Sequence, residues 1–179
     1  MRRADFSVLH RARRALALCV ALAIAPSSWA KPPDIPPYID NAVTALVAQF
    51  SDGMAVSYPE FRYIVRGKVL DSGGKDAVVF FSIEGFHGGN YHAEYMALFA
   101  AVPPEDAGAD KNAHPFRLVA VAQIGGRGER TFRWETARLR PNEITVSGLR
   151  WGKNDPGCCA SRPIKVTFRV VNGNIVEVK

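Results

Sequence analysis

Two adjacent cysteines, Cys158 and Cys159, carry the most distinctive chemistry in this 179-residue chain. Consecutive Cα atoms lie about 3.8 Å apart across a trans peptide, whereas relaxed disulfides prefer about 4.4–6.8 Å. A bridge between these two would therefore be strained and easily reduced. Four states fit the pair: a vicinal disulfide, two free thiols, bridges to partner chains, or soft-metal ligands. A redox role and a purely structural role as a loop staple both remain open.

A second group of candidate residues, His87, His92 and Glu94, lies in the run G-F-H-G-G-N-Y-H-A-E. If this run enters a strand, His92 and Glu94 share a face, because side chains alternate along a strand. His87 could then fold back across the Gly88-Gly89 turn and complete a metal or acid/base cluster. The spacing matches no specific zinc motif. The alternative is a hairpin loop with solvated histidines and glycines at positive φ.

Complete catalytic or cofactor motifs are absent from the sequence. The glycine-rich segments 72–75 and 125–128 lack the spacing of a phosphate-binding loop and are better explained as hairpin turns. There is no G-x-S-x-G motif, so a hydrolase would need a triad assembled in space around His87, His92 or His114. We predict no cofactor.

Residues 1–30 have the pattern of a secretory signal peptide. A basic start is followed by an apolar run, Ala15 to Ala25, and by the small-residue end Ser28-Trp29-Ala30. The apolar run is shorter than the roughly 20 residues of a membrane span. We predict cleavage after Ala30, loss of Cys19 with the signal, and one exported periplasmic domain, residues 31–179, with no membrane span.

The basic balance of the whole chain comes largely from this N-terminal segment. The chain has 23 basic and 17 acidic residues, and residues 1–30 hold five of the basic and one of the acidic ones. Residues 31–179 therefore keep 18 and 16, a net charge of +2. So small a charge gives no support for a nucleic-acid partner. We expect a small ligand or an unidentified envelope partner instead.

Apolar periodicity predicts one helix near the start of the exported part. Ile39, Val43, Leu46, Val47 and Phe50 recur at helical spacing within residues 38–50. The segment Ser51-Asp52-Gly53 then ends the helix with turn chemistry.

The rest of the chain alternates short apolar segments with turn residues. Segment 77–83 is almost continuously apolar, which indicates a strand covered on both faces, and 164–171 alternates strictly. Segment 91–102 fits helix or strand, and we favour strand because it lies between two strong strand candidates. Asn172-Gly173 predicts a tight hairpin turn. The predicted strands are 61–70, 77–83, 91–102, 116–124, 130–139, 143–151, 164–171 and 174–178.

These segments together predict a mainly β (α+β) fold. It is an antiparallel meander of about eight strands with one N-terminal helix, and the sheet forms a curved sheet, a sandwich or a barrel.

Several of these segments resemble small exported bacterial proteins of uncharacterised function, akin to the LppP/LprE lipoprotein family. The most specific part of the resemblance is D-P-G-C-C-A-S, residues 155–161, beside the family's late Asp-x-x-Cys-Cys-Pro-Ser motif. Ala160 stands where the motif has proline, and the lipid-attachment cysteine is missing. The resemblance implies an envelope location and implies no activity.

Two functional hypotheses follow from the sequence. The first is a non-enzymatic periplasmic domain that binds a ligand or partner, with the Cys158-Cys159 loop as a structural element. The second is a redox-responsive or metal-handling protein that uses this pair together with His87 and His92.

Overall fold

The computed structural model describes residues 34–103 and 114–178. These residues form one α-helix, one short 3-10 helix and eight strands. They are α1 (Pro37–Phe50), η1 (Pro59–Phe61), β1 (Tyr63–Gly67), β2 (Asp76–Phe86), β3 (Tyr91–Ala101), β4 (Phe116–Gly126), β5 (Arg130–Arg140), β6 (Glu143–Arg150), β7 (Arg162–Val171) and β8 (Asn174–Val178). The strands make one antiparallel sheet in the order β1 to β8. The predicted mainly β meander with one helix is confirmed.

The predicted signal peptide, with Cys19 and Ala30, lies outside the described residues. Within the described part of the chain, no helix combines the length and apolar content that a membrane crossing requires.

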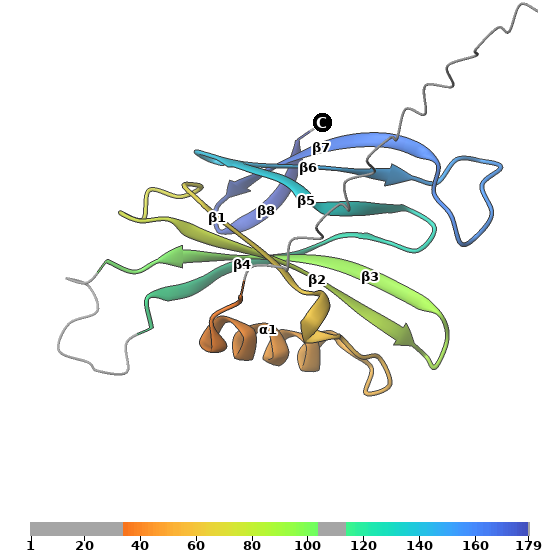
Figure 1. Ribbon diagram of the computed structural model, residues 1–179, viewed down its shortest axis with the longest axis horizontal. Helices are drawn as coiled ribbons and strands as arrows, with labels where there is room; N and C mark the ends of the chain where they lie inside the picture. Colours follow the sequence, from red (N-terminus) through yellow and green to blue (C-terminus); the bar gives the residue numbers. More distant parts are fainter. Residues whose placement is uncertain (1–33, 104–113, 179) are drawn as a thin grey trace, which may run out of the picture. The chain divides into compact units, whose positions relative to one another are not determined.

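The sheet is open and bends sharply between β4 and β5. Gly126 and Arg130 are the register pair that joins these two strands, whereas the other neighbouring strands pair over five or more positions. Strands β5–β8 therefore fold back over β1–β4 (Figure 1). A hydrophobic core fills the space between the two halves, with contributions from Val78, Phe80, Leu98, Ile144 and Phe168.

Helix α1 covers the opposite face of β1–β4 (Figure 1). Its buried residues Ile39, Val43 and Leu46 follow the predicted helical spacing and pack in one cluster with Val79 and Phe81 of β2. Strand β2 is therefore covered on both faces, as its sequence predicts, because odd residues meet the helix and even residues meet β5–β8.

Strand β1 is shorter than its apolar pattern predicts. The sequence predicts a strand over residues 61–70, but β1 covers only Tyr63–Gly67. Phe61 belongs instead to η1, which starts at Pro59. Beyond the strand, the buried Asp76 carboxylate accepts the backbone N–H groups of Val69 at 2.9 Å and Leu70 at 2.7 Å. These bonds hold the chain in a loop at the point where pairing between β1 and β2 would otherwise continue.

The ambiguous segment after the glycine-rich turn is a strand, β3, as we expected. The alternation predicted for β7 is also confirmed, because Val166 and Phe168 are buried between more exposed neighbours. Asn172 and Gly173 both have positive φ, 51° and 75°, which fits the predicted hairpin turn into β8.

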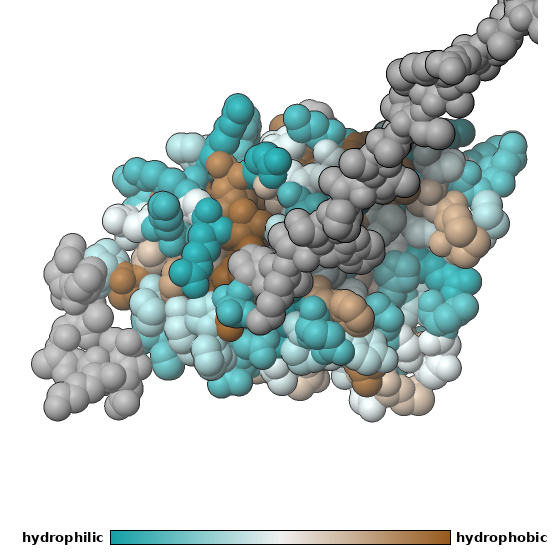
Figure 2. Space-filling model, in the orientation of Figure 1, coloured by the Kyte–Doolittle hydropathy of each residue, from teal (hydrophilic) through white to brown (hydrophobic). Residues whose placement is uncertain are grey.

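The surface follows the same alternation. Figure 2 shows a face that is mostly hydrophilic, with a strip of hydrophobic residues where β5 passes beside β1. Tyr63 and Val65 of β1 and Leu139 of β5 are partly buried and pack against the core between the two halves.

Candidate functional site

A polar cleft of about 540 Å³ lies where the β2–β3 hairpin turns, between this hairpin and β5. The hairpin strands supply Ser82, Glu84, His92 and Glu94. Strand β5 supplies Thr131 and Trp134, and the segment after α1 supplies Met54, Val56 and Tyr58. The cleft thus combines carboxyl groups, a histidine and aromatic rings at one end of the folded sheet.

Strand register brings the polar side chains of the hairpin together. Ser82 of β2 pairs with Glu94 of β3, and Glu84 pairs with His92. All four have even numbers and so face β5–β8. Further along the same face the side chains are apolar and buried, beginning with Phe80. The cleft is therefore the polar end of a face that is otherwise hydrophobic core.

Glu94 is the most deeply buried of the acidic side chains that line the cleft, with 4 % of its surface exposed. Its carboxyl oxygens accept the backbone N–H of Phe132 at 2.9 Å, the indole N–H of Trp134 at 3.4 Å and the hydroxyl of Thr131. Burial raises the pKa of Glu94 above its ordinary value, while these hydrogen bonds and the nearby His92 act in the opposite direction. The three hydrogen bonds therefore fix the carboxyl group in place.

The donors to Glu94 come from β5, whose geometry depends on one glycine and one bulge. Gly148 of β6 lies opposite Phe132, and a Cβ at this position would collide with the backbone oxygen of Thr131. Between Arg133 and Arg138 the register of β5 shifts, and the Thr136 hydroxyl accepts the backbone N–H of Ser147 at 2.9 Å. The bulge keeps residues on both sides of it facing inward.

The prediction that His92 and Glu94 share a face is confirmed, since both line the cleft. His87 lies elsewhere. Its φ is 55°, its side chain is 88 % exposed, and its Nδ1 is 3.2 Å from an oxygen of Asp52. His87 therefore does not complete a cluster with the other two. Among residues 34–103 and 114–178, no group of three or more His, Cys, Asp or Glu side chains is arranged to hold a metal ion.

Asp52 organises the rim of the cleft, a role that its place in a predicted turn did not reveal. Its carboxylate accepts the backbone N–H groups of His87 at 2.7 Å and of Met54 and Ala55 at 3.0 Å. These bonds, led by the one from His87, lower the pKa of Asp52. One carboxylate thereby links the segment after α1 to the β2–β3 turn.

A short backbone bridge attaches the same rim to β2. The N–H of Val56 donates to the carbonyl of Glu84 at 2.8 Å, and the N–H of Glu84 donates to the carbonyl of Val56 at 2.8 Å. Met54, Val56 and Tyr58 all expose large apolar surfaces beside the cleft. The apolar side of the cleft is therefore held by hydrogen bonds to the strand that carries its acidic side.

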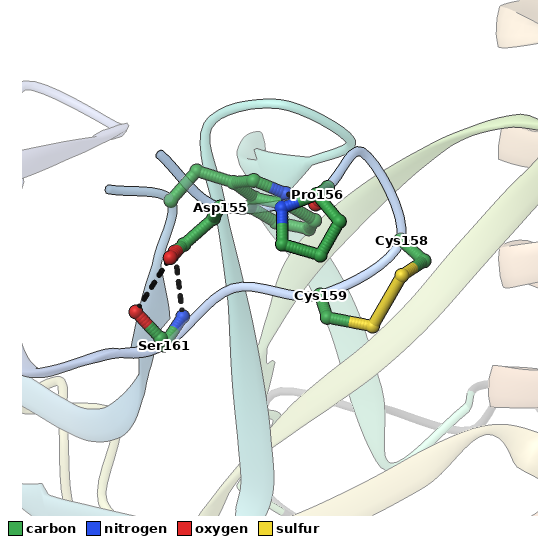
Figure 3. The surroundings of a disulfide bond; sticks show 6 residues. Asp155, Pro156, Cys158, Cys159 and Ser161 are labelled. Atoms are coloured by element: carbon green, nitrogen blue, oxygen red, sulfur yellow. Dashed lines mark hydrogen bonds between the residues drawn. A yellow bond between two sulfur atoms is a disulfide. The ribbon is translucent and has the colours of Figure 1, made fainter. Parts of the chain in front are cut away.

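The two cysteines form a vicinal disulfide on the exposed loop between β6 and β7. Their Cα atoms are 3.8 Å apart. Figure 3 shows the pair at the outer end of the loop, away from the contact between Asp155 and Ser161. Of the four states that fit the pair, this structure therefore has the vicinal disulfide.

Asp155 closes the base of this loop. Its carboxylate accepts the N–H of Gly152 at 2.7 Å, the N–H of Ser161 at 2.9 Å and the hydroxyl of Ser161 at 2.8 Å. The bond from Gly152 is the largest cause of its lowered pKa, followed by the Ser161 hydroxyl. Cys159 also donates its N–H to the carbonyl of Pro156 at 3.0 Å. The aspartate and serine of the D-P-G-C-C-A-S segment therefore bind each other and fix the loop independently of the sulfur atoms.

The disulfide loop and the cleft lie at the same end of the sheet. Arg127, in the β4–β5 turn, donates to the Asn90 carbonyl at 3.0 Å and also binds the Asn90 side chain. Asn90 lines the cleft, and the other side of the Arg127 guanidinium lies next to Gly157 of the disulfide loop. One arginine thus lies between the two candidate sites.

Comparisons with protein-family models, with curated protein sequences and with solved structures gave no match for this chain. The resemblance to the LppP/LprE lipoproteins therefore stays a prediction, and the role of the cleft must be inferred from its own side chains.

Proposed function

We propose that this chain is an exported periplasmic domain that binds a small ligand in the cleft between the β2–β3 hairpin and β5. In this proposal the Cys158-Cys159 loop is a structural element beside the site. Periplasmic export rests on the sequence pattern of residues 1–30, and a disulfide between the remaining two cysteines suits an oxidising compartment.

The observation that carries the proposal is a buried carboxyl group, Glu94, at the wall of an open cleft. Burying a carboxyl costs free energy unless its oxygens are paired, and three donors from β5 supply the partners. A fold that needed only stability could place an apolar residue here, as it does at Phe80 and Met96 on the same face. A preorganised polar group in a concave site is typical of ligand recognition.

The exposed apolar rim supports the same conclusion. Met54, Val56 and Tyr58 lie beside the cleft with large parts of their side chains in water. Covering them with the body of a ligand would remove apolar surface from water, which favours binding at about 25 cal/mol per Å². The site therefore offers both a polar anchor and an apolar contact.

Thermal unfolding in the presence of a chemically diverse set of small molecules tests this proposal. The protein should be isolated from the periplasm after expression of the full chain. Its intact mass should equal that of a chain that begins at Lys31. At least one compound is expected to raise the Tm saturably. The rise should be lost in Ser82→Leu, which fills the cleft, and kept in Thr145→Leu, on the outer face of β6.

Compounds that stabilise both variants equally would place the binding site elsewhere. A set that leaves the Tm unchanged throughout would contradict the proposal.

The second candidate function is a redox response of Cys158 and Cys159. The supporting observation is that the bonded pair lies exposed on a loop whose base is closed separately by Asp155 and Ser161. A dithiol reductant would supply two electrons and two protons, break the S–S bond and leave two thiols, while the reductant became a disulfide. The loop can pass between both states because its hydrogen bonds do not involve the sulfur atoms.

Thiol alkylation before and after reduction, followed by intact mass measurement, tests this candidate. A redox role predicts that the pair is fully oxidised in isolated protein and is opened by a dithiol of physiological potential without unfolding. A pair that opens only on denaturation would exclude it.

A further inference from the structure

We propose that the cleft binds an organic cation, an ammonium or guanidinium group carried on an aromatic or aliphatic body. Glu94 and Glu84 would contact the charged group, and the apolar rim would contact the body. This inference rests on the proposed function, and it adds the charge class of the ligand.

The charged side chains of the cleft favour a cation. Two of the residues that line it are glutamates and one is a histidine, and among the described residues that line it none is lysine or arginine. Ser82 donates its hydroxyl to Glu84 at 3.2 Å, which keeps that carboxylate beside the hairpin. This composition contrasts with the slightly basic balance of residues 31–179 as a whole. The negative charge is therefore local to the site.

The arginines near the cleft are held by other partners. Arg127 is bound to the carbonyl and side chain of Asn90. Arg130 donates to the Ile124 carbonyl at 2.6 Å and forms an ion pair with Glu177 at 2.7 Å. Among the described residues, neither arginine is hydrogen-bonded or ion-paired to a glutamate of the cleft, so neither Arg127 nor Arg130 neutralises these two carboxyl groups.

The aromatic side chains suit the body of such a ligand. Trp134 lines the inner wall, stacked on the buried Phe80 with ring centroids 6.2 Å apart, and Tyr58 lies at the rim. The electron-rich face of an aromatic ring attracts a cation, and the hydrophobic part of the ligand would cover Met54 and Val56.

Glu94 retains capacity for a ligand. A carboxylate offers about four lone-pair sites, and three donors of β5 occupy only part of them. Burial disfavours its charged form, whereas a bound ammonium favours that form, so a cationic ligand would stabilise the Glu94 carboxylate. Among the described residues, the other titratable groups that line the cleft with it are Glu84 on β2, His92 on β3 and Tyr58 in the segment after α1, while β5 presents uncharged Thr131 and Trp134.

Isothermal titration with three probes of similar size tests the inference. The probes are 2-phenylethylamine, 2-phenylethanol and 3-phenylpropanoate, which share a ring and a short chain and carry positive, neutral and negative head groups at pH 7. Because hydrogen bonds to charged groups are worth about 1.5–3 kcal/mol, we expect the amine to bind about 10- to 100-fold more tightly than the alcohol. The propanoate should bind most weakly.

Glu94→Gln keeps the size of the side chain and removes its charge. It should weaken binding of the amine at least about tenfold and leave the alcohol nearly unchanged. Glu143→Gln is the matched control, because this partly exposed glutamate pairs with Arg169 on the outer face of the sheet and should not affect either probe.

Equal binding of amine and alcohol, or tightest binding of the propanoate, would overturn the cation inference while leaving a ligand site in the cleft. Failure of all three probes to bind would also overturn it, and the proposed function would then be decided separately by the thermal screen.

Discussion

The two faces of the β2–β3 hairpin differ in the polarity of their side chains near the turn. The face toward α1 is apolar up to the hairpin turn, with Phe81 and Ile83 of β2 packed in one cluster with the helix. The face toward β5 is apolar at Phe80 but changes to Ser82 and Glu84 before the same turn. Both faces are made from alternate residues of the same strands. One face is therefore continuous hydrophobic core, whereas the turn end of the other carries the polar side chains of the proposed site.

The largest effect should come from breaking the stable face. Phe81→Ala removes a fully buried ring that stacks on Tyr95 and should lower the free energy of unfolding by about 3–5 kcal/mol. Urea unfolding followed by circular dichroism measures this loss. Phe61→Ala is the control, because its side chain is 64 % exposed, and it should change stability by less than about 0.5 kcal/mol. Equal losses in the two variants would contradict the assignment of the core.

On the polar face, Glu94→Gln should remove the part of the pH dependence of the unfolding free energy that comes from this carboxyl group. Because the folded protein raises the pKa of Glu94 above its ordinary value of 4.5, the folded state holds this proton more tightly than the unfolded state. Its contribution is therefore greatest below pH 4.5 and is lost as the pH rises through the folded pKa. Denaturant unfolding at a series of pH values should show that wild type loses stability relative to Glu94→Gln as the pH rises from 4.5 through the folded pKa. A constant difference between the two proteins would show that Glu94 does not titrate as inferred.

Thr131→Val, in the same cleft, should have a smaller effect on stability. It keeps the shape of the side chain and removes one hydrogen bond to Glu94, at a cost of about 1 kcal/mol. Since that bond favours the charged carboxylate, its loss should raise the pKa of Glu94 further. Carbon-13 NMR of the Glu94 carboxyl group measures the shift. Thr145→Val, in the same sheet but bonded to Thr167, is the control and should leave that pKa unchanged.

The smallest global effect should come from the disulfide loop. Asp155→Ala removes the acceptor of the Gly152 and Ser161 amides, which should then exchange hydrogen faster. Reduction of Cys158 and Cys159 in the wild-type protein should leave those two amides protected. The hydrogen bonds of the loop lower the pKa of Asp155. The protection that its carboxylate gives to the Gly152 and Ser161 amides is therefore present above the ordinary pKa of 3.8 and is lost as the pH falls through the lowered pKa. Loss of protection on reduction alone would show that the sulfur bridge, and not Asp155, fixes the loop.

Local patterns in the sequence were enough for most of the fold. The spacing of Ile39, Val43 and Leu46 specified α1, and Asn172-Gly173 specified the last hairpin. Strand β1 was predicted too long because its end depends on Asp76, which reaches back to the amides of Val69 and Leu70. Such a bond between side chain and backbone leaves no periodic trace in the sequence.

Only the part of the candidate site that lies on a single strand could be predicted from the sequence. His92 and Glu94 lie two residues apart on one strand, so alternation placed them together. Thr131 and Trp134 come from β5, 37 and 40 residues beyond Glu94, and reach it only because the sheet bends between β4 and β5. Of the two possibilities left open for His87, the structure has the exposed hairpin loop, because Asp52, 35 residues away, binds the backbone N–H of His87 in the turn.

The most direct test of the central claim is a proton–nitrogen NMR spectrum of the indole N–H groups during titration with 2-phenylethylamine. Trp134 reports on the cleft, since its indole donates to Glu94, and Trp151 reports on the disulfide loop, since its indole donates to the Pro156 carbonyl. If the cleft is the ligand site, the signal of Trp134 shifts saturably and that of Trp151 stays fixed. A shift of Trp151 alone, or of neither signal, would contradict that claim.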